Sequence, residues 1–170
     1  MTFSTIIKLL NRANELKGTS ISDLLKGKEF NRNNKGSIGN IIEHEGFGIK
    51  NNNDDRPDFP ELGVELKVLP LKRGAKNQLA VKERTKICSI NYTKLIEEKW
   101  HVSHARNKLA KILFVFYEYN KEEPSESKII DYKLFDLESN DEPLIKSDWE
   151  RTKKNVADGY AHLLSESQNV

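Results

Sequence analysis

The sequence predicts an α/β or α+β domain in which helices flank one mixed central β-sheet. Two observations carry this prediction: apolar residues recur with a helical period near both ends of the chain and alternate with polar ones in its middle. With 170 residues, 36% of them hydrophobic, the chain can bury one core, and we expect a single domain over residues 1–170. Its longest apolar run, Ile112 to Tyr117, is strand-sized and too short to span a membrane.

Three helices are expected before the sheet, over residues 4–17, 21–25 and 37–45. Ser4 is the candidate N-cap of the first helix, and Gly18 stops it. Before the second helix, Ser20 and Asp23 have the spacing of a capping box, although Thr19 could also serve as the cap.

From Leu62 onward the pattern changes to a period of two. It indicates a strand with Leu66 on one face and with Glu65 and Lys67 on the other. Further strands are predicted over residues 85–91, 112–119 and 129–137. The near-continuous apolar run 112–119 is typical of a central strand that is covered on both faces.

Two more helices complete the expected fold, one through Leu95 and Trp100 and a final one over residues 148–164. The final helix is expected to bury its apolar residues, namely Trp149, Val156, Tyr160, Leu163 and Leu164. The single cysteine, Cys88, lies in the strand predicted over residues 85–91 and should be buried and inert. A lone cysteine forms no internal disulfide, and the N-terminus does not have the pattern of a signal peptide, so we expect a cytoplasmic protein.

Basic residues concentrate in the middle of the chain. The segment from Val64 to Lys111 holds twelve Lys or Arg and four acidic residues, a balance of +8, whereas the rest of the chain carries −6. Such a band could face the phosphates of DNA. It could equally be an ordinary solvated surface, and charge alone does not decide between the two.

One short pattern indicates chemistry: Asp58, then Glu65 and Lys67 after six intervening residues. The Pro60 to Gly63 bend could return the Asp58 carboxylate toward Glu65, and two converging carboxylates form an oxygen site suited to Mg²⁺, with the Leu66 carbonyl as a third oxygen. A lysine beside that metal could orient or deprotonate a water. The alternative is a surface strand with Glu and Lys as ordinary neighbours, but its other face is fully apolar, which favours a strand of the core sheet.

Four segments, in order along the chain, resemble one known family: residues 35–43, 57–67, 103–109 and 147–150. They are similar to the DNA mismatch repair endonuclease family of MutH and equally to the type II restriction endonucleases of the same fold. The resemblance implies a restriction-endonuclease-like fold of the PD-(D/E)xK nuclease superfamily, with Mg²⁺-dependent hydrolysis of double-stranded DNA at GATC.

The resemblance also implies roles for individual residues. Asp58 and Glu65 would bind the metal, Glu43 would complete the metal site from a helix, and Lys67 would position the water. Lys108 would be a second lysine near the scissile phosphate or the attacking water. Without the family, Glu43 could be a solvated acid and Lys108 one more surface charge. The residues expected to contact DNA are Lys35, Arg84 and Arg106, although Arg84 could equally be a strand-edge charge.

Within this family, three segments favour a restriction enzyme: residues 89–92, 116–119 and 145–149. One alternative is a mismatch repair nickase, which cuts one strand of hemimethylated sites. Another, of a different class, is a DNA-binding effector domain without catalysis, against which the intact Glu43, Asp58, Glu65 and Lys67 argue.

Family members continue beyond the position that matches Val170, with a part that supplies much of the base-specific contact. We therefore expect a catalytic domain truncated before its DNA-recognition part. Such a chain should be a monomer alone, with a dimer or a two-domain arrangement on DNA. It should bind duplex DNA without sequence preference and cleave it weakly or not at all.

Overall fold

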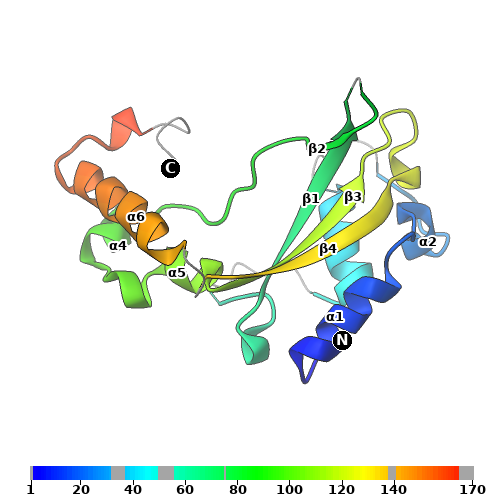
Figure 1. The fold of residues 1–170 in the computed structure, drawn as a ribbon, viewed down its shortest axis with the longest axis horizontal. Helices are drawn as coiled ribbons and strands as arrows, with labels where there is room; N and C mark the ends of the chain where they lie inside the picture. Colours follow the sequence, from blue (N-terminus) through cyan, green and yellow to red (C-terminus); the bar gives the residue numbers. More distant parts are fainter. Residues whose placement is uncertain (1, 32–36, 50–55, 75, 138–140, 165–170) are drawn as a thin grey trace. The chain divides into compact units, whose positions relative to one another are not determined.

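The computed structural model describes residues 2–31, 37–49, 56–74, 76–137 and 141–164. The chain forms two compact units (Figure 1). The first consists of Met1–Thr85 and Ile112–Phe135, and the second of Lys86–Lys111 and Asp136–Val170. A single domain over the whole chain therefore stays a prediction. Over the described residues, every helix is too short or too polar to cross a membrane.

A four-stranded mixed sheet with helices confirms the predicted fold class. The strands are β1 (Glu65–Arg73), β2 (Leu79–Val81), β3 (Lys111–Glu118) and β4 (Lys128–Asp136), in the order β2-β1-β3-β4. β1 pairs in parallel with β3, from Glu65 opposite Ile112 to Leu71 opposite Glu118. β2 is antiparallel to β1 and pairs only with its last three residues. The central place of β3, between β1 and β4, agrees with its apolar sequence.

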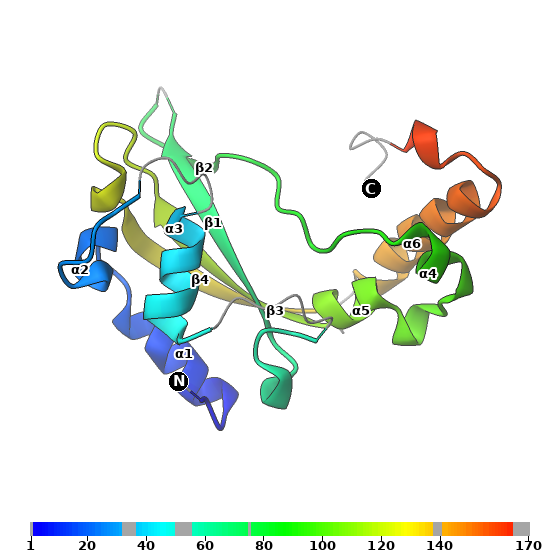
Figure 2. The same cartoon turned by 180° about the vertical axis from the view of Figure 1, so that it is seen from behind.

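The helices of the first unit lie along one face of the sheet (Figure 2). They are α1 (Ile6–Glu15), α2 (Ile21–Leu25), α3 (Ser37–Ile41) and the π-helical turn η1 (Ile42–Gly46). Between helices and sheet lies a core in which Leu9, Ile42 and Leu113 are fully buried. A short 3-10 turn, η4 (Pro124–Glu126), precedes β4.

Local signals at the first two helices are mostly confirmed. Ser20 and Asp23 form the predicted capping box of α2, with the Asp23 N–H donating to Ser20 Oγ over 3.1 Å. The N-cap of α1 is Thr5 instead of Ser4, because the Thr5 side chain accepts from the Lys8 N–H. The first helix therefore begins at Ile6, one to two residues later than the apolar pattern indicated.

The third helix ends in an unpredicted π-helical turn. The Arg12 Nε of α1 donates to the Gly46 carbonyl over 2.8 Å, and a Cβ at Gly46 would lie 3.2 Å from the Leu16 side chain. This close approach of two helices fixes the end of η1. Such turns depend on tertiary packing, so apolar spacing predicted only an ordinary helix over residues 37–45.

The second unit is helical. Its elements are α4 (Tyr92–Glu97), η3 (Trp100–Val102), α5 (His104–Leu109), α6 (Glu142–Ala157) and η5 (Ala161–Leu163). The Trp100 and Trp149 rings lie 5.6 Å apart. Glu142 Oε1 accepts from Trp100 Nε1 at 2.9 Å and from Arg106 Nε at 2.7 Å. These contacts tie the start of α6 to η3 and α5.

Two sequence predictions in this region are wrong. Residues 85–91 form no strand; the partner of β1 is instead Leu79–Val81, which a turn at Gly74–Asn77 brings beside it. Cys88 accordingly lies half-buried in a segment without regular structure, not inside a strand.

The final helix also differs from the prediction. It begins at Glu142 and ends at Ala157, because Gly159 adopts a φ of 83° and the Tyr160 N–H donates to the Asn155 carbonyl over 2.8 Å. Tyr160 and Leu163, expected in its buried set, are 53% and 58% exposed. The one buried residue of α6 is Thr152.

Candidate active site

The candidate site lies at the beginning of β1, on the edge away from β3. Because β2 pairs only with Leu71–Arg73, the first part of β1 has no strand partner on that side among the described residues. Backbone groups at an unpaired strand edge need other hydrogen-bond partners. The Leu66 N–H finds one in Asp58, whose Oδ2 accepts from it over 2.9 Å.

A tight loop holds Asp58 in this position. Phe59 and Val64 form an antiparallel bridge, with the Phe59 N–H donating to the Val64 carbonyl over 2.9 Å. Between them lie the 3-10 turn η2 (Pro60–Leu62) and Gly63, which has a φ of 62° that favours glycine. The predicted bend is therefore confirmed, and it returns Asp58 to the residue that follows Glu65.

Glu65 and Lys67 lie on the same face of β1, as the alternation predicted. Lys67 Nζ donates to Glu65 Oε1 over 2.8 Å. The Glu65 side chain is only 4% exposed and that of Lys67 is 21% exposed. A buried carboxylate is stable only when it is paired or hydrogen-bonded, and Lys67 supplies a positive charge at this distance.

Glu43 reaches the same site from η1. Burial raises the pKa of Glu43 above its usual value, and the negative charges of Asp58 and Glu65 raise it further, whereas Lys67 lowers it. The turn η1 contacts β1, and the charges that act on Glu43 come from β1 and from the loop before η2. Three acids and one lysine thus share a partly buried site, in which the acids repel one another.

The donor set fits a divalent cation, because carboxylate oxygens are the ligands that Mg²⁺ prefers. A cation would also relieve the repulsion that raises the pKa of Glu43. Within the described part of the chain, however, no three His, Cys, Asp or Glu side chains are already gathered around one point. Asp58 instead bonds the Leu66 N–H and Glu65 bonds Lys67, so binding would require these carboxylates to turn.

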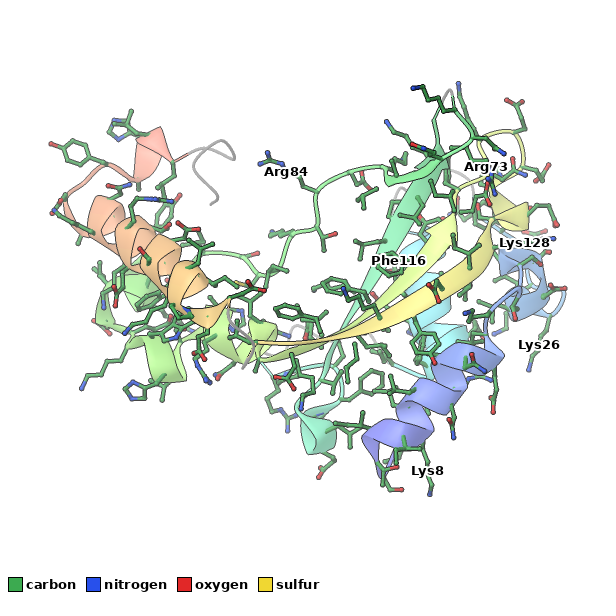
Figure 3. The ribbon with its side chains drawn as sticks, viewed as in Figure 1. Lys8, Lys26, Arg73, Arg84, Phe116 and Lys128 are labelled. Atoms are coloured by element: carbon green, nitrogen blue, oxygen red, sulfur yellow. The ribbon has the colours of Figure 1, made fainter. Side chains whose placement is uncertain are left out.

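The other predicted site residues belong to other segments of the chain. Lys108 belongs to α5 of the second unit, where it is 8% exposed, and its role near the scissile phosphate stays a prediction. Arg84 is exposed on the segment after β2 (Figure 3). Arg106 forms the ion pair with Glu142 and so has a structural role in the second unit. Lys35 lies outside the described residues, and the DNA contacts of all three basic residues stay predictions.

Sequence reasoning missed the Leu66 N–H as the group that anchors Asp58. The only signal for it is the spacing of Asp58 from the strand, which shows neither the unpaired edge of β1 nor the bridge between Phe59 and Val64. Both features require the sheet to be assembled.

Comparison with known proteins identifies a family for this chain. Residues 47–148 match the family model described as DNA mismatch repair enzyme MutH. The chain is 38% identical over 159 residues to the type II restriction enzyme Sau3AI of Staphylococcus aureus, covering 92% of this chain and 32% of that enzyme. It is 29% identical over 172 residues to the DNA mismatch repair protein MutH of Vibrio vulnificus, covering 98% of this chain and 74% of that protein.

The chain thus spans about a third of the length of the Staphylococcus aureus enzyme, and most of the length of the repair protein. The matched family segment contains Asp58, Glu65, Lys67 and Lys108, while Glu43 lies just before it. The resemblance predicted from the four sequence segments is confirmed: the chain belongs to the MutH family.

Proposed function

We propose that this chain is the catalytic core of a cytoplasmic, Mg²⁺-dependent endonuclease that hydrolyses both strands of double-stranded DNA at GATC. The restriction enzyme of Staphylococcus aureus, 38% identical to it, supports this assignment. The observation that carries the proposal is the placement of Asp58 beside Leu66 and of Lys67 beside Glu65 at the start of β1. The turn η1, which carries Glu43, contacts the same strand. The chain would be a monomer alone, and two cores would act together on DNA when both strands are cut.

In this proposal, Asp58 and Glu65 hold the Mg²⁺, and Glu43 completes the site. The Leu66 carbonyl is a further ligand candidate: in an extended strand the N–H and C=O of one residue point to the same side, and the Leu66 N–H faces Asp58. A bound Mg²⁺ would supply positive charge beside the phosphate oxygens in the transition state.

Lys67 has two tasks in the proposed reaction. Lys67, held beside Glu65, would orient the attacking water toward the phosphorus and, as the neutral amine, would accept the proton that this water loses. Its positive charge would also stabilise the additional negative charge on the phosphate as the new bond forms. Because Lys67 is half-buried, this charge is screened less by solvent than that of an exposed lysine.

A single-turnover assay tests the proposal, with the chain in excess over a duplex that contains one unmethylated GATC sequence. We expect slow cleavage of both strands that requires Mg²⁺ and stops when a chelator is added. The matched substrate has the same composition with GATC scrambled. Equal cleavage of both duplexes would agree with the expectation that residues 1–170 alone have no sequence preference, whereas preferential cleavage of the GATC duplex would place the specificity within this chain. No metal-dependent cleavage of either duplex would contradict the catalytic assignment.

A repair nickase is the second candidate, since the MutH protein of Vibrio vulnificus is similar over 98% of this chain. The same assay, repeated with a hemimethylated GATC duplex, separates the two functions. A restriction enzyme cuts both strands of unmethylated GATC without any partner, whereas a nickase of the repair type leaves one strand of a hemimethylated duplex intact.

A DNA-binding module without catalysis is the third candidate. It is favoured by the absence, among the described residues, of three side chains already placed around a metal. Titration calorimetry with Mg²⁺ alone distinguishes it, because a non-catalytic module should bind no metal, whereas the proposed nuclease should bind one ion. The Glu65→Ala substitution should abolish this binding.

A further inference from the structure

The hairpin of β1 and β2 carries a dense positive charge that the proposed reaction does not use. We call residues 71–82 the basic hairpin. Its cationic residues are Lys72, Arg73, Lys76 and Lys82, and the sequence has no acidic residue from Leu66 to Lys82. All four are exposed. A projecting hairpin of one charge sign is a candidate surface for a polyanion.

Hydrogen bonds give the basic hairpin a defined shape. The Gly74 N–H donates to the Gln78 carbonyl, and the Asn77 N–H to the Gly74 carbonyl, each over 2.9 Å. Arg73, labelled in Figure 3, donates through Nη1 to the Asn77 side-chain oxygen over 3.2 Å. Arg73 also pairs with Glu118 of β3. Arg73 is therefore already paired, and its contacts hold the turn against the sheet.

The three lysines of the basic hairpin are left for other partners. Among the described residues, neither Lys72, Lys76 nor Lys82 forms an ion pair; Lys82 Nζ lies 4.7 Å from the centre of the Tyr119 ring. Three like charges on one hairpin repel one another. Phosphates of a nucleic-acid backbone would remove this repulsion, and they attract lysine without regard to base sequence.

The distance along β1 indicates which phosphates these would be. Lys67 and Arg73 are six residues apart on one continuous strand, which corresponds to about 20 Å at the usual rise of a β-strand. The phosphates of one DNA strand repeat about every 3.4 Å along the axis, so with β1 placed along that axis 20 Å corresponds to about six base pairs. That position lies outside a four-base recognition sequence.

We infer that the basic hairpin binds the phosphate backbone of duplex DNA that flanks the recognition sequence, about six base pairs from the cleaved bond. This inference rests on the proposed function for the identity of the polyanion and for the position of the reaction centre at Lys67. The hairpin would contribute affinity and orientation without base specificity, and Lys72 and Lys76 would carry it while Arg73 holds the turn.

The test compares the wild-type chain with the double variant Lys72→Gln/Lys76→Gln in DNA-binding titrations over a range of salt concentrations. A matched control, Lys8→Gln/Lys26→Gln, removes two exposed lysines from the helical side of the same unit. We expect the slope of log affinity against log salt to fall by about 1 for each hairpin lysine, or about 2 in all. The control should keep the wild-type slope.

A second measurement locates the contact. GATC duplexes that extend about three and about twelve base pairs beyond the site on each side are compared, the shorter ending before the expected phosphates. The wild-type chain should cleave the longer duplex at lower protein concentration, and the hairpin variant should lose this advantage.

The two assignments fail in different ways. An unchanged salt slope in the hairpin variant, with cleavage intact, overturns the inference and leaves the proposed function standing. A reduced slope in the hairpin variant, together with a wild-type chain that never cleaves DNA, supports the hairpin contact and contradicts the nuclease. A wild-type chain that binds no duplex contradicts both.

Discussion

The two ends of β1 carry charged side chains in different surroundings, buried at the first end and exposed at the second. At the first end, Glu65 is 3% exposed and shares its surroundings with Asp58 and Glu43. At the other end, the Arg73 side chain is 47% exposed and continues into a hairpin of solvated lysines. Buried charges interact strongly and are fixed in direction, whereas exposed ones are weakened by solvent and salt. The first end of β1 is therefore suited to a chemical reaction, and the second end is suited to electrostatic attraction of a polyanion.

This comparison predicts that changes at the first end alter the rate of cleavage and that changes at the second alter only affinity. The largest effect is expected for the metal-binding acids. Asp58→Ala and Glu65→Ala should each abolish cleavage while DNA affinity stays near that of the wild type, because removing a ligand removes the metal's contribution.

The measurement is single-turnover cleavage together with binding by fluorescence anisotropy. Glu61→Ala is the matched control, since Glu61 is an exposed acid of the same loop. Wild-type rates in either the Asp58 or the Glu65 variant would show that the reaction centre lies elsewhere.

Lys67→Arg should have the next largest effect. Arginine keeps the positive charge but not the compact ammonium group, and it does not lose its proton. We expect cleavage to slow by roughly 10² or more, the range of a lost acid-base or electrostatic group. The pH–rate profile, measured beside the rate, should also change shape. Near-normal turnover would mean that Lys67 only contacts a phosphate. The first end of β1 would then contribute through Lys67 to DNA affinity, as the second end does, and not to the rate of cleavage.

Glu43→Gln should stabilise the metal-free chain while it weakens cleavage. The folded-state pKa of Glu43 is raised, so the folded chain holds this proton at a pH where the unfolded chain has released it. Stability from this group is therefore highest at low pH and is lost as pH rises from the usual glutamate range toward the raised pKa. The melting temperature of the metal-free variant should exceed that of the wild type at neutral pH.

Melting curves at several pH values check this prediction, with Glu61→Gln as the control for a change of net charge. The difference between Glu43→Gln and the wild type should grow with pH and shrink when Mg²⁺ is added. A variant less stable than the wild type at neutral pH would indicate that Glu43 is held by favourable contacts and is not strained.

The smallest effect concerns a residue outside both ends of β1. Ser20→Ala removes the side chain that caps α2, and the loss should be about 1 kcal/mol of unfolding free energy. Chemical denaturation measures it, and the cleavage rate of the folded protein should not change. A loss of cleavage equal to that of the site variants would mean that rates report general stability and not the chemistry at Glu65.

Much of the site could be predicted from the sequence because it depends on neighbours along the chain. The period of two placed Glu65 and Lys67 on one face, and the Pro60 to Gly63 bend returned Asp58 to the strand. Ser20 and Asp23 formed their capping box for the same reason. The prediction that Glu43 belongs to the same site as Glu65 came from the family resemblance, since no local pattern connects residue 43 with residue 65.

Other features were decided by contacts between residues far apart in the sequence. Residues 85–91 have strand-like composition but no strand partner, whereas the exposed Leu79–Val81 segment pairs with β1 because the turn after Arg73 aligns it. In the same way, the π-helical turn that carries Glu43 depends on Arg12 and Leu16 of α1.

The sequence by itself therefore determined the fold class, the acids and lysine of the candidate site, and the family. Only the tertiary structure decided which strand borders β1, where its edge stays open and which charges act on Glu43. The physical reason is that alternation, caps and turns are set by residues a few positions apart, which the sequence displays directly. Strand pairing, burial and the pKa of a carboxyl depend on which distant segments the folded chain brings together.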